Sequence, residues 1–168
     1  AAPSGPAAAA AAVVVVGRAG RRRAGRAAVS DRPRALIVAL WIGFAVTCAY
    51  WLVWFFVDRE LLASLHTPAY YAFENAFPLA DAWLALGFAA SARALQRRRP
   101  IAVFWLLVTG SASLYLASMD ILFDLENGVY AAPDRSAVIT ELVINAATVA
   151  LGVWTLRQGW RNRARLVG

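Results

Sequence analysis

The fold is decided by a stretch without a single charged residue, ALIVALWIGFAVTCAYWLVWFFV, at residues 35–57. As an α-helix its 23 residues cover about 34 Å, because each residue adds 1.5 Å. That length is enough for the hydrocarbon core of a bilayer, which is about 30 Å thick. The sequence therefore predicts a membrane-spanning helix. We expect the aromatic residues at its C-terminal end to form a belt against lipid at the interface, namely Trp51, Trp54, Phe55 and Phe56.

Three more apolar segments follow, and clusters of Arg lie before the first span, between the second and the third, and after the fourth. Fifteen of the 17 basic residues, all of them Arg, lie in three clusters at 18–34, 93–99 and 157–165. Because short loops rich in Arg stay in the cytoplasm, these clusters orient the apolar segments. We therefore predict an all-α polytopic membrane protein with four transmembrane helices in an antiparallel bundle and with both termini cytoplasmic. The predicted spans are 35–57, 69–95, 101–123 and 137–156.

The composition predicts one membrane domain between two basic tails. With 61% hydrophobic and 16% charged residues, the chain is too apolar for a soluble domain of 168 residues. We expect residues 1–34 to be a disordered cytoplasmic tail rich in Ala and Arg. Residues 35–157 form the transmembrane domain, and residues 158–168 form a basic cytoplasmic tail.

The Arg clusters also indicate the partners and the location. The net charge is +7, but each cluster adjoins a span, so we expect it to bind anionic lipids of the inner leaflet and not nucleic acid. A homo-oligomer or a larger membrane complex is the other expected partner. The absence of Lys beside abundant Ala and Arg is typical of a GC-rich bacterial gene, which favours a bacterial plasma membrane.

Carboxylates inside the predicted spans are the unusual feature of this chain. Glu74 and Asp81 are seven residues apart, so one face of a helix would carry both. An ionised carboxylate near the bilayer centre costs about 2.5 to 3.5 kcal/mol on insertion scales. Pro78 lies between them and has no N–H, so we predict a helix kink that leaves the carbonyl oxygen of Glu74 free.

More acidic and polar residues occur towards the same side of the predicted membrane. Asp120 and Asp124 share a face of the third span, as Glu141 and Asn145 do on the fourth. The outer half holds nine carboxylates and two Arg, a net charge of −7, which the positive-inside rule does not explain. The predicted residues for binding an ion or a proton are therefore Asp81, Glu74, Asp120, Asp124, Glu141 and Asn145.

Small residues predict where helices approach each other closely. In lipid, helices associate through close backbone packing, which Gly and Ala permit. Gly110 lies in a patch of small residues in the third span, and Ala150 forms a small-xxx-small pattern with Ala146 in the fourth. We expect Gly110 and Ala150 to lie at helix contacts.

Three functions of different classes follow from these features. The first is a transporter or transport subunit that binds protons or cations in an outward-facing cavity lined by carboxylates. The second is an accessory or assembly protein without chemistry, whose polar residues hold its helices together. The third is a membrane-embedded enzyme acting on lipid, with Glu74 and Asp120 as acid and base and His66 as a participant. The sequence has no metalloprotease, P-loop, Gly-x-Ser-x-Gly or CxxC motif, so we expect no cofactor and favour a non-enzyme.

Overall fold

A computed structural model describes residues 34–167, and this part of the chain is helical without strands. The elements are α2 (Arg34–Phe56), η1 (Arg59–Leu61), α3 (Pro68–Glu74), α4 (Pro78–Gln96), α5 (Ala102–Glu126), η2 (Val129–Ala131) and α6 (Arg135–Val167). The predicted N-terminal tail, residues 1–34, lies outside the described residues except for Arg34.

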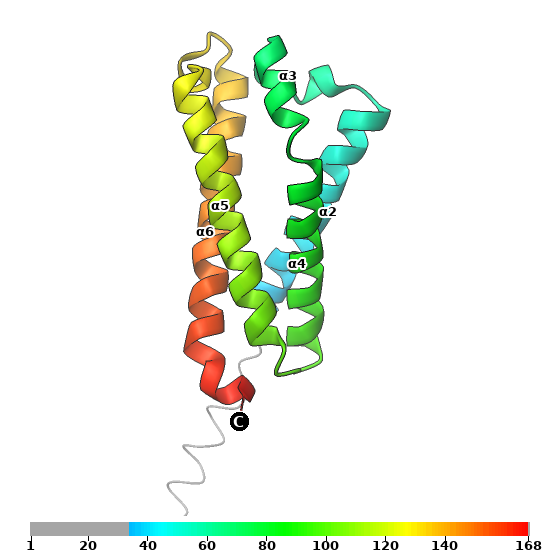
Figure 1. Ribbon diagram of the computed structural model, residues 1–168, viewed down its shortest axis with the longest axis vertical. Helices are drawn as coiled ribbons and strands as arrows, with labels where there is room; N and C mark the ends of the chain where they lie inside the picture. Colours follow the sequence, from blue (N-terminus) through cyan, green and yellow to red (C-terminus); the bar gives the residue numbers. More distant parts are fainter. Residues whose placement is uncertain (1–33, 168) are drawn as a thin grey trace, which may run out of the picture. The chain divides into compact units, whose positions relative to one another are not determined.

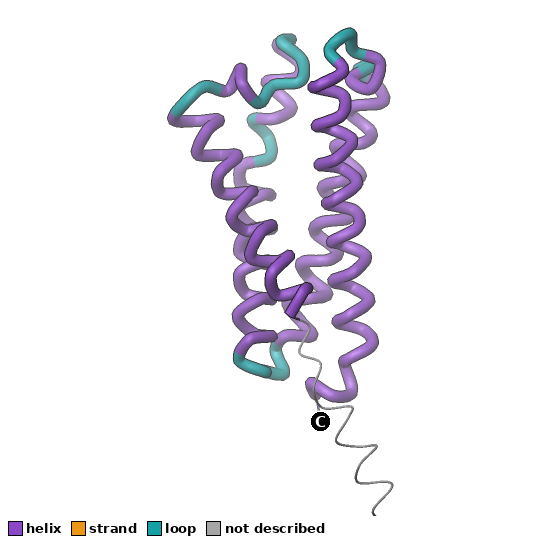
Figure 2. The backbone as a smooth tube through the Cα atoms, turned by 180° about the vertical axis from the view of Figure 1, so that it is seen from behind, coloured by secondary structure: helices purple, strands orange, loops and turns teal. Residues whose placement is uncertain are grey.

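The long helices of the unit formed by residues 35–168 run alongside one another (Figure 1). We call one end of this unit the basic end, because the turn at residues 97–101 and the C-terminal part of α6 carry Arg there. The opposite end, the loop end, is made by η1, α3 and η2 with their connecting loops (Figure 2). The helices α5 and α6 therefore extend from the basic end to the loop end, whereas α4 extends from the break after α3 to the basic end.

Three helices in the described part of the chain are long and apolar enough to cross a membrane. They are α2, α5 and the Arg135–Ala164 portion of α6. The sequence predicted α2 and α5 to within three residues at each end. α6 continues beyond the predicted end at Leu156, so the residues of the predicted C-terminal tail extend the same helix to Val167.

The predicted second span at 69–95 is not one continuous helix, and the predicted kink is a break. α3 ends at Glu74, and α4 begins at Pro78. Pro78 occupies the first turn of α4, where its missing N–H has no helical partner to lose. The prediction of a free carbonyl was wrong, because the Glu74 oxygen accepts the N–H of Phe77 at 3.0 Å. The chain therefore satisfies that oxygen with a tight turn.

Small and hydroxyl-bearing residues bring α5 close to both of its neighbours. A Cβ added to Gly110 on α5 would lie 2.9 Å from the carbonyl oxygen of Gly152 on α6. On the other side, the hydroxyl groups of Ser91 on α4 and Thr109 on α5 are hydrogen-bonded at 3.0 Å. The prediction for Gly110 is therefore confirmed. The prediction for Ala150 was wrong, because Ala150 is exposed and lines a cavity.

The apolar core lies between α2, α4 and α5. It consists of Leu36, Leu40, Leu84, Phe88, Ala92, Leu106 and Leu116. Leu84, Phe88 and Leu116 also line the cavity, so the core forms one of its walls. Large apolar side chains are exposed on α2, α4, α5 and α6, as expected for helices whose outer faces contact lipid.

Candidate functional site

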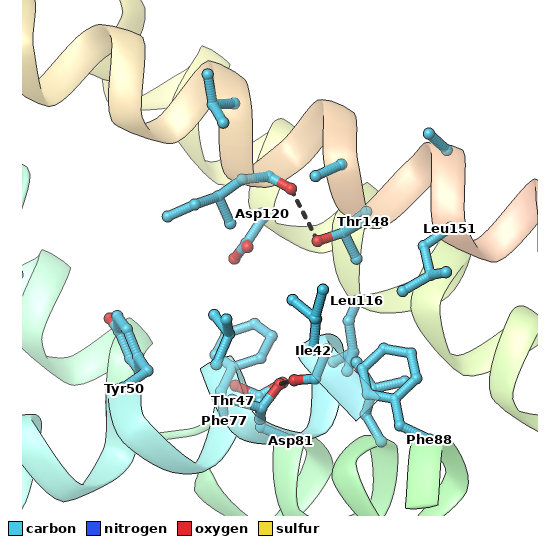
Figure 3. A pocket seen from close by; sticks show the side chains of 18 of the residues that line it. Ile42, Thr47, Tyr50, Phe77, Asp81, Phe88, Leu116, Asp120, Thr148 and Leu151 are labelled. Atoms are coloured by element: carbon cyan, nitrogen blue, oxygen red, sulfur yellow. Dashed lines mark hydrogen bonds between the residues drawn. The ribbon is translucent and has the colours of Figure 1, made fainter. Parts of the chain in front are cut away.

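A cavity of about 630 Å³ is lined by side chains of α2, α4, α5 and α6 (Figure 3). Its size lies within the range of pockets that hold small molecules, roughly 300 to 1,000 Å³. Most of the side chains that line it are apolar. They include Ile42, Val46, Phe77, Leu84, Phe88, Leu116, Val143, Ile144, Leu151 and Trp154.

Four of the six residues predicted to bind an ion or proton line this one cavity. Glu74 comes from the end of α3, Asp81 from α4, Asp120 from α5 and Glu141 from α6. Among the described residues that line the cavity there is no Arg or His. The structure thus brings together acidic groups from four helices, without a basic side chain in the wall of the cavity.

Two of these carboxylates are held by aromatic residues of α2. The hydroxyl of Tyr50 donates to Oε2 of Glu74 at 2.9 Å, and the indole Nε1–H of Trp51 donates to Oδ2 of Asp81 at 3.0 Å. Both carboxylates are half-buried. The break between α3 and α4 separates Glu74 from Asp81, and two adjacent residues of α2 reach across to them. Their common placement therefore depends on α2 and not on a shared helix face.

The other two carboxylates differ in how they are held. Glu141 accepts hydrogen bonds from the hydroxyls of Ser64 in the loop before α3 and of Tyr70 on α3, the latter at 3.2 Å. For Asp120, the structure shows no hydrogen-bond donor in the described part of the chain, and its side chain points into the cavity (Figure 3). Every donor seen on these carboxylates is uncharged, so none neutralises them.

The interpretation of the α2 aromatic residues as a lipid belt was wrong for two of the four. Trp54 is 4% exposed and donates its indole N–H to Oδ1 of Asn75, in the break between α3 and α4, at 3.1 Å. Trp51 donates to Asp81. Only Phe55 and Phe56 are exposed, the latter by 81%. The signal that distinguishes the two pairs is chemical, since the inward-facing residues have a polar hydrogen to donate.

The remaining two predicted residues, Asp124 and Asn145, lie outside the wall of the cavity. The Nδ2 of Asn145 donates to Oδ2 of Asp124 at 2.8 Å and to the hydroxyl of Tyr130 at 2.9 Å. Asp124 and Asn145 are only 4% and 3% exposed. Burial and the neighbouring Asp124 raise the pKa of Tyr130 to about 12, so its hydroxyl keeps its proton at neutral pH. The two hydrogen bonds of Asn145 therefore connect α6 with α5 and with η2.

His66 is exposed, and its Nδ1 lies 3.0 Å from the hydroxyl of Tyr71. It does not line the cavity, so the proposed acid and base of the enzyme hypothesis have no His beside them. Within residues 34–167, no three His, Cys, Asp or Glu side chains are grouped so that they could hold a metal ion. No protein-family model, curated protein or solved structure matches this chain. Its function is therefore inferred from the cavity itself.

Proposed function

We propose that this protein is a small multi-pass membrane protein that binds protons or cations in the acidic cavity, as a transporter or as a subunit of one. The observation that carries the proposal is the convergence of Glu74, Asp81, Asp120 and Glu141 on one cavity without a basic lining residue. A carboxylate among apolar side chains is protonated, hydrated or bound to a cation, because an isolated charge there is costly. The first and the last of these states are those of a site that takes up a proton or a cation.

The proposed topology has four crossings, of which α3 and α4 together make the second. Transporters commonly place their ion sites at helices that are broken within the membrane. The break at residues 75–77 lies between the cavity residues Glu74 and Asp81, which fits that arrangement. With the Arg clusters in the cytoplasm of a bacterial cell, the loop end and the acidic part of the cavity would face outward.

The topology is tested with reporters at the two ends. A reporter fused after Gly168 should be active in the cytoplasm, and one inserted at residues 127–134 should be active outside the cell. These outcomes follow because the Arg clusters at 93–99 and 157–165 are retained inside. A reporter after Gly168 that is active only outside would contradict an even number of crossings.

A role in assembly is the second candidate, and one observation favours it. The carboxylates bond between elements, since Tyr50 on α2 binds Glu74 on α3, and Tyr70 on α3 binds Glu141 on α6. Such bonds stabilise helix packing in membranes by about 1 to 2 kcal/mol at most. A purely structural carboxylate would tolerate replacement by its amide, whereas a group that exchanges a proton would not.

Asp120→Asn is the decisive variant, because Asp120 has no hydrogen-bond donor in the described residues that a substitution could disturb. Purified protein is reconstituted in liposomes, and proton and cation uptake is followed from about pH 5 to about pH 8. We expect Asp120→Asn to lose the response with unchanged thermal stability. Glu126→Gln is the matched control, because Glu126 is exposed at the end of α5 and is expected to change nothing. A wild-type protein without any response would overturn the proposal in favour of an assembly role.

A further inference from the structure

The acidic cavity has an apolar part that a proton or a simple metal cation does not require. On α4, Leu84 and Phe88 follow Asp81 towards the basic end. On α6, Leu151 and Trp154 follow Glu141 in the same direction. Because a helix rises 1.5 Å per residue, the lining residues extend about 10 Å beyond Asp81 and about 20 Å beyond Glu141. The cavity is therefore amphipathic, with its carboxylates towards the loop end.

Apolar residues of α2 and α6 that line the cavity are also exposed. Ile42 and Val46 on α2 line the cavity and yet are 57% and 61% exposed. Val143 and Ile144 on α6 line it from the opposite side and are 60% and 42% exposed. Exposed lining residues on both helices are those that would border an opening between α2 and α6. In a bilayer, this opening would connect the cavity with the lipid chains.

We infer that the ligand of this cavity is an amphiphilic organic cation, meaning an ammonium or similar cationic group attached to an apolar body. This inference rests on the proposed function, because it assigns the cation that the carboxylates bind. The positive group would lie beside Asp120 and Glu141, and the apolar body would contact Leu84 and Phe88. The molecule would first dissolve in the bilayer and then enter between α2 and α6.

Charge and surface chemistry both favour an amphiphilic cation over a phospholipid. Carboxylates without basic neighbours attract a cation, and the ring of Tyr50, whose hydroxyl bonds to Glu74, offers cation–π attraction in the acidic part of the wall. Burial of the apolar body contributes about 25 cal/mol per Å² removed from water. A phospholipid with a phosphate group would place a negative charge beside the acidic groups, which is unfavourable.

The test compares probes of equal charge and different apolar size on the intact protein. Binding of tetraphenylphosphonium and tetramethylammonium is measured by equilibrium binding in nanodiscs, and binding to empty nanodiscs is subtracted. Triphenylphosphine oxide serves as the neutral apolar probe. We expect tetraphenylphosphonium to bind at least about tenfold more tightly than tetramethylammonium, because burial of about 60 Å² of apolar surface suffices for that ratio. This comparison needs no variant.

Ala150→Leu tests the apolar part of the cavity, and Asp120→Asn tests the acidic part. Ala150→Leu adds bulk to the lining on α6, and Ala146→Leu is the matched control on an exposed position of α6 that does not line the cavity. We expect Ala150→Leu to weaken tetraphenylphosphonium binding at least about fivefold, while Ala146→Leu leaves both this binding and the proton response unchanged. Asp120→Asn should weaken binding of both cations.

The outcomes distinguish failure of this inference from failure of the proposed function. Equal binding of the two cations, with an intact proton response, would overturn the amphiphilic ligand and leave a proton or cation site. Neutral phosphine oxide binding as tightly as tetraphenylphosphonium would also overturn it, since the cavity would then select for apolarity alone. The absence of a response to protons and to every cation would overturn both proposals.

Discussion

The contact between Gly110 on α5 and Gly152 on α6 allows the sharpest prediction of stability. In Gly110→Ala, the new Cβ would lie 2.9 Å from the Gly152 carbonyl oxygen and 2.7 Å from Cγ of Leu156. Ordinary contact begins at 3.4 Å, so the two backbones must separate by about 0.5 Å at this point. A side chain can rotate away, but the Gly152 oxygen belongs to the helix backbone. Overpacking of this kind costs about 1 to 3 kcal/mol.

The assay for this prediction is the free energy of unfolding in mixed detergent micelles. We expect Gly110→Ala to be less stable than the wild type by about 1 to 3 kcal/mol. Ser111→Ala is the control, because Ser111 is the next residue on α5 and is exposed. Equal stability of Gly110→Ala and Ser111→Ala would refute the close contact between α5 and α6. A greater loss for Ser111→Ala would refute it as well.

Three further predictions concern polar contacts and one turn. Trp51→Phe removes the donor to Asp81 and should lower the free energy of unfolding by about 1 to 2 kcal/mol. An unchanged value would contradict this bond. Gly128 has a φ of 70°, in the left-handed region. In the same assay, Gly128→Ala should lower the free energy of unfolding by about 1 kcal/mol, and Gly128→Asn should lower it distinctly less. Equal losses for the two variants would argue against the left-handed turn. Asn145→Leu removes the hydrogen bond to the hydroxyl of Tyr130, so trypsin should cut after Arg135 faster than in the wild type. An equal rate of cleavage would count against that hydrogen bond.

Helices α2, α5 and α6 could be predicted from the sequence because length and apolar composition suffice to indicate them. The break before α4 could not be predicted with the same evidence. Pro78 is compatible with a kink inside a helix and with the first turn of a new helix, and its lack of an N–H is common to both. The hydrogen bond from Trp54 to Asn75 belongs to the broken form. That contact joins residues 21 positions apart, which local sequence patterns do not report.

The depth of a residue along its helix was easier to predict than the direction of its side chain. Trp51 and Phe55 occupy the same end of α2, but only Phe55 points outward. Likewise, Gly110 lies at a helix contact while Ala150 lies on an exposed surface, although both fit small-residue patterns. The spacing of residues reveals which of them share a face, and the partners of that face are decided by tertiary packing.

For the candidate site residues too, the sequence indicated the position along the helix but not the direction of the side chain. Asp120 and Asp124 are four residues apart on α5, yet Asp120 lines the cavity and Asp124 binds Asn145. Both carboxylates lie near the C-terminal end of α5, towards the loop end. Asn145 on α6 marks the difference, because it donates to Asp124 and to the hydroxyl of Tyr130, whereas Asp120 has no donor in the described residues. The spacing along α5 does not report that contact.

The hydrogen-bond donors of the cavity carboxylates bear on whether these carboxylates serve helix packing or binding. An acidic group that serves only packing is cheapest when an Arg neutralises it, or when an apolar residue replaces it. Here the donors are the uncharged Tyr50, Trp51 and Tyr70, which orient Glu74, Asp81 and Glu141 without cancelling their charge. Each ionised carboxylate at membrane depth costs about 2.5 to 3.5 kcal/mol, and Asp120 has no donor in the described residues to offset that cost. An arrangement that orients negative charge and leaves it available is the one that binding of a proton or a cation requires.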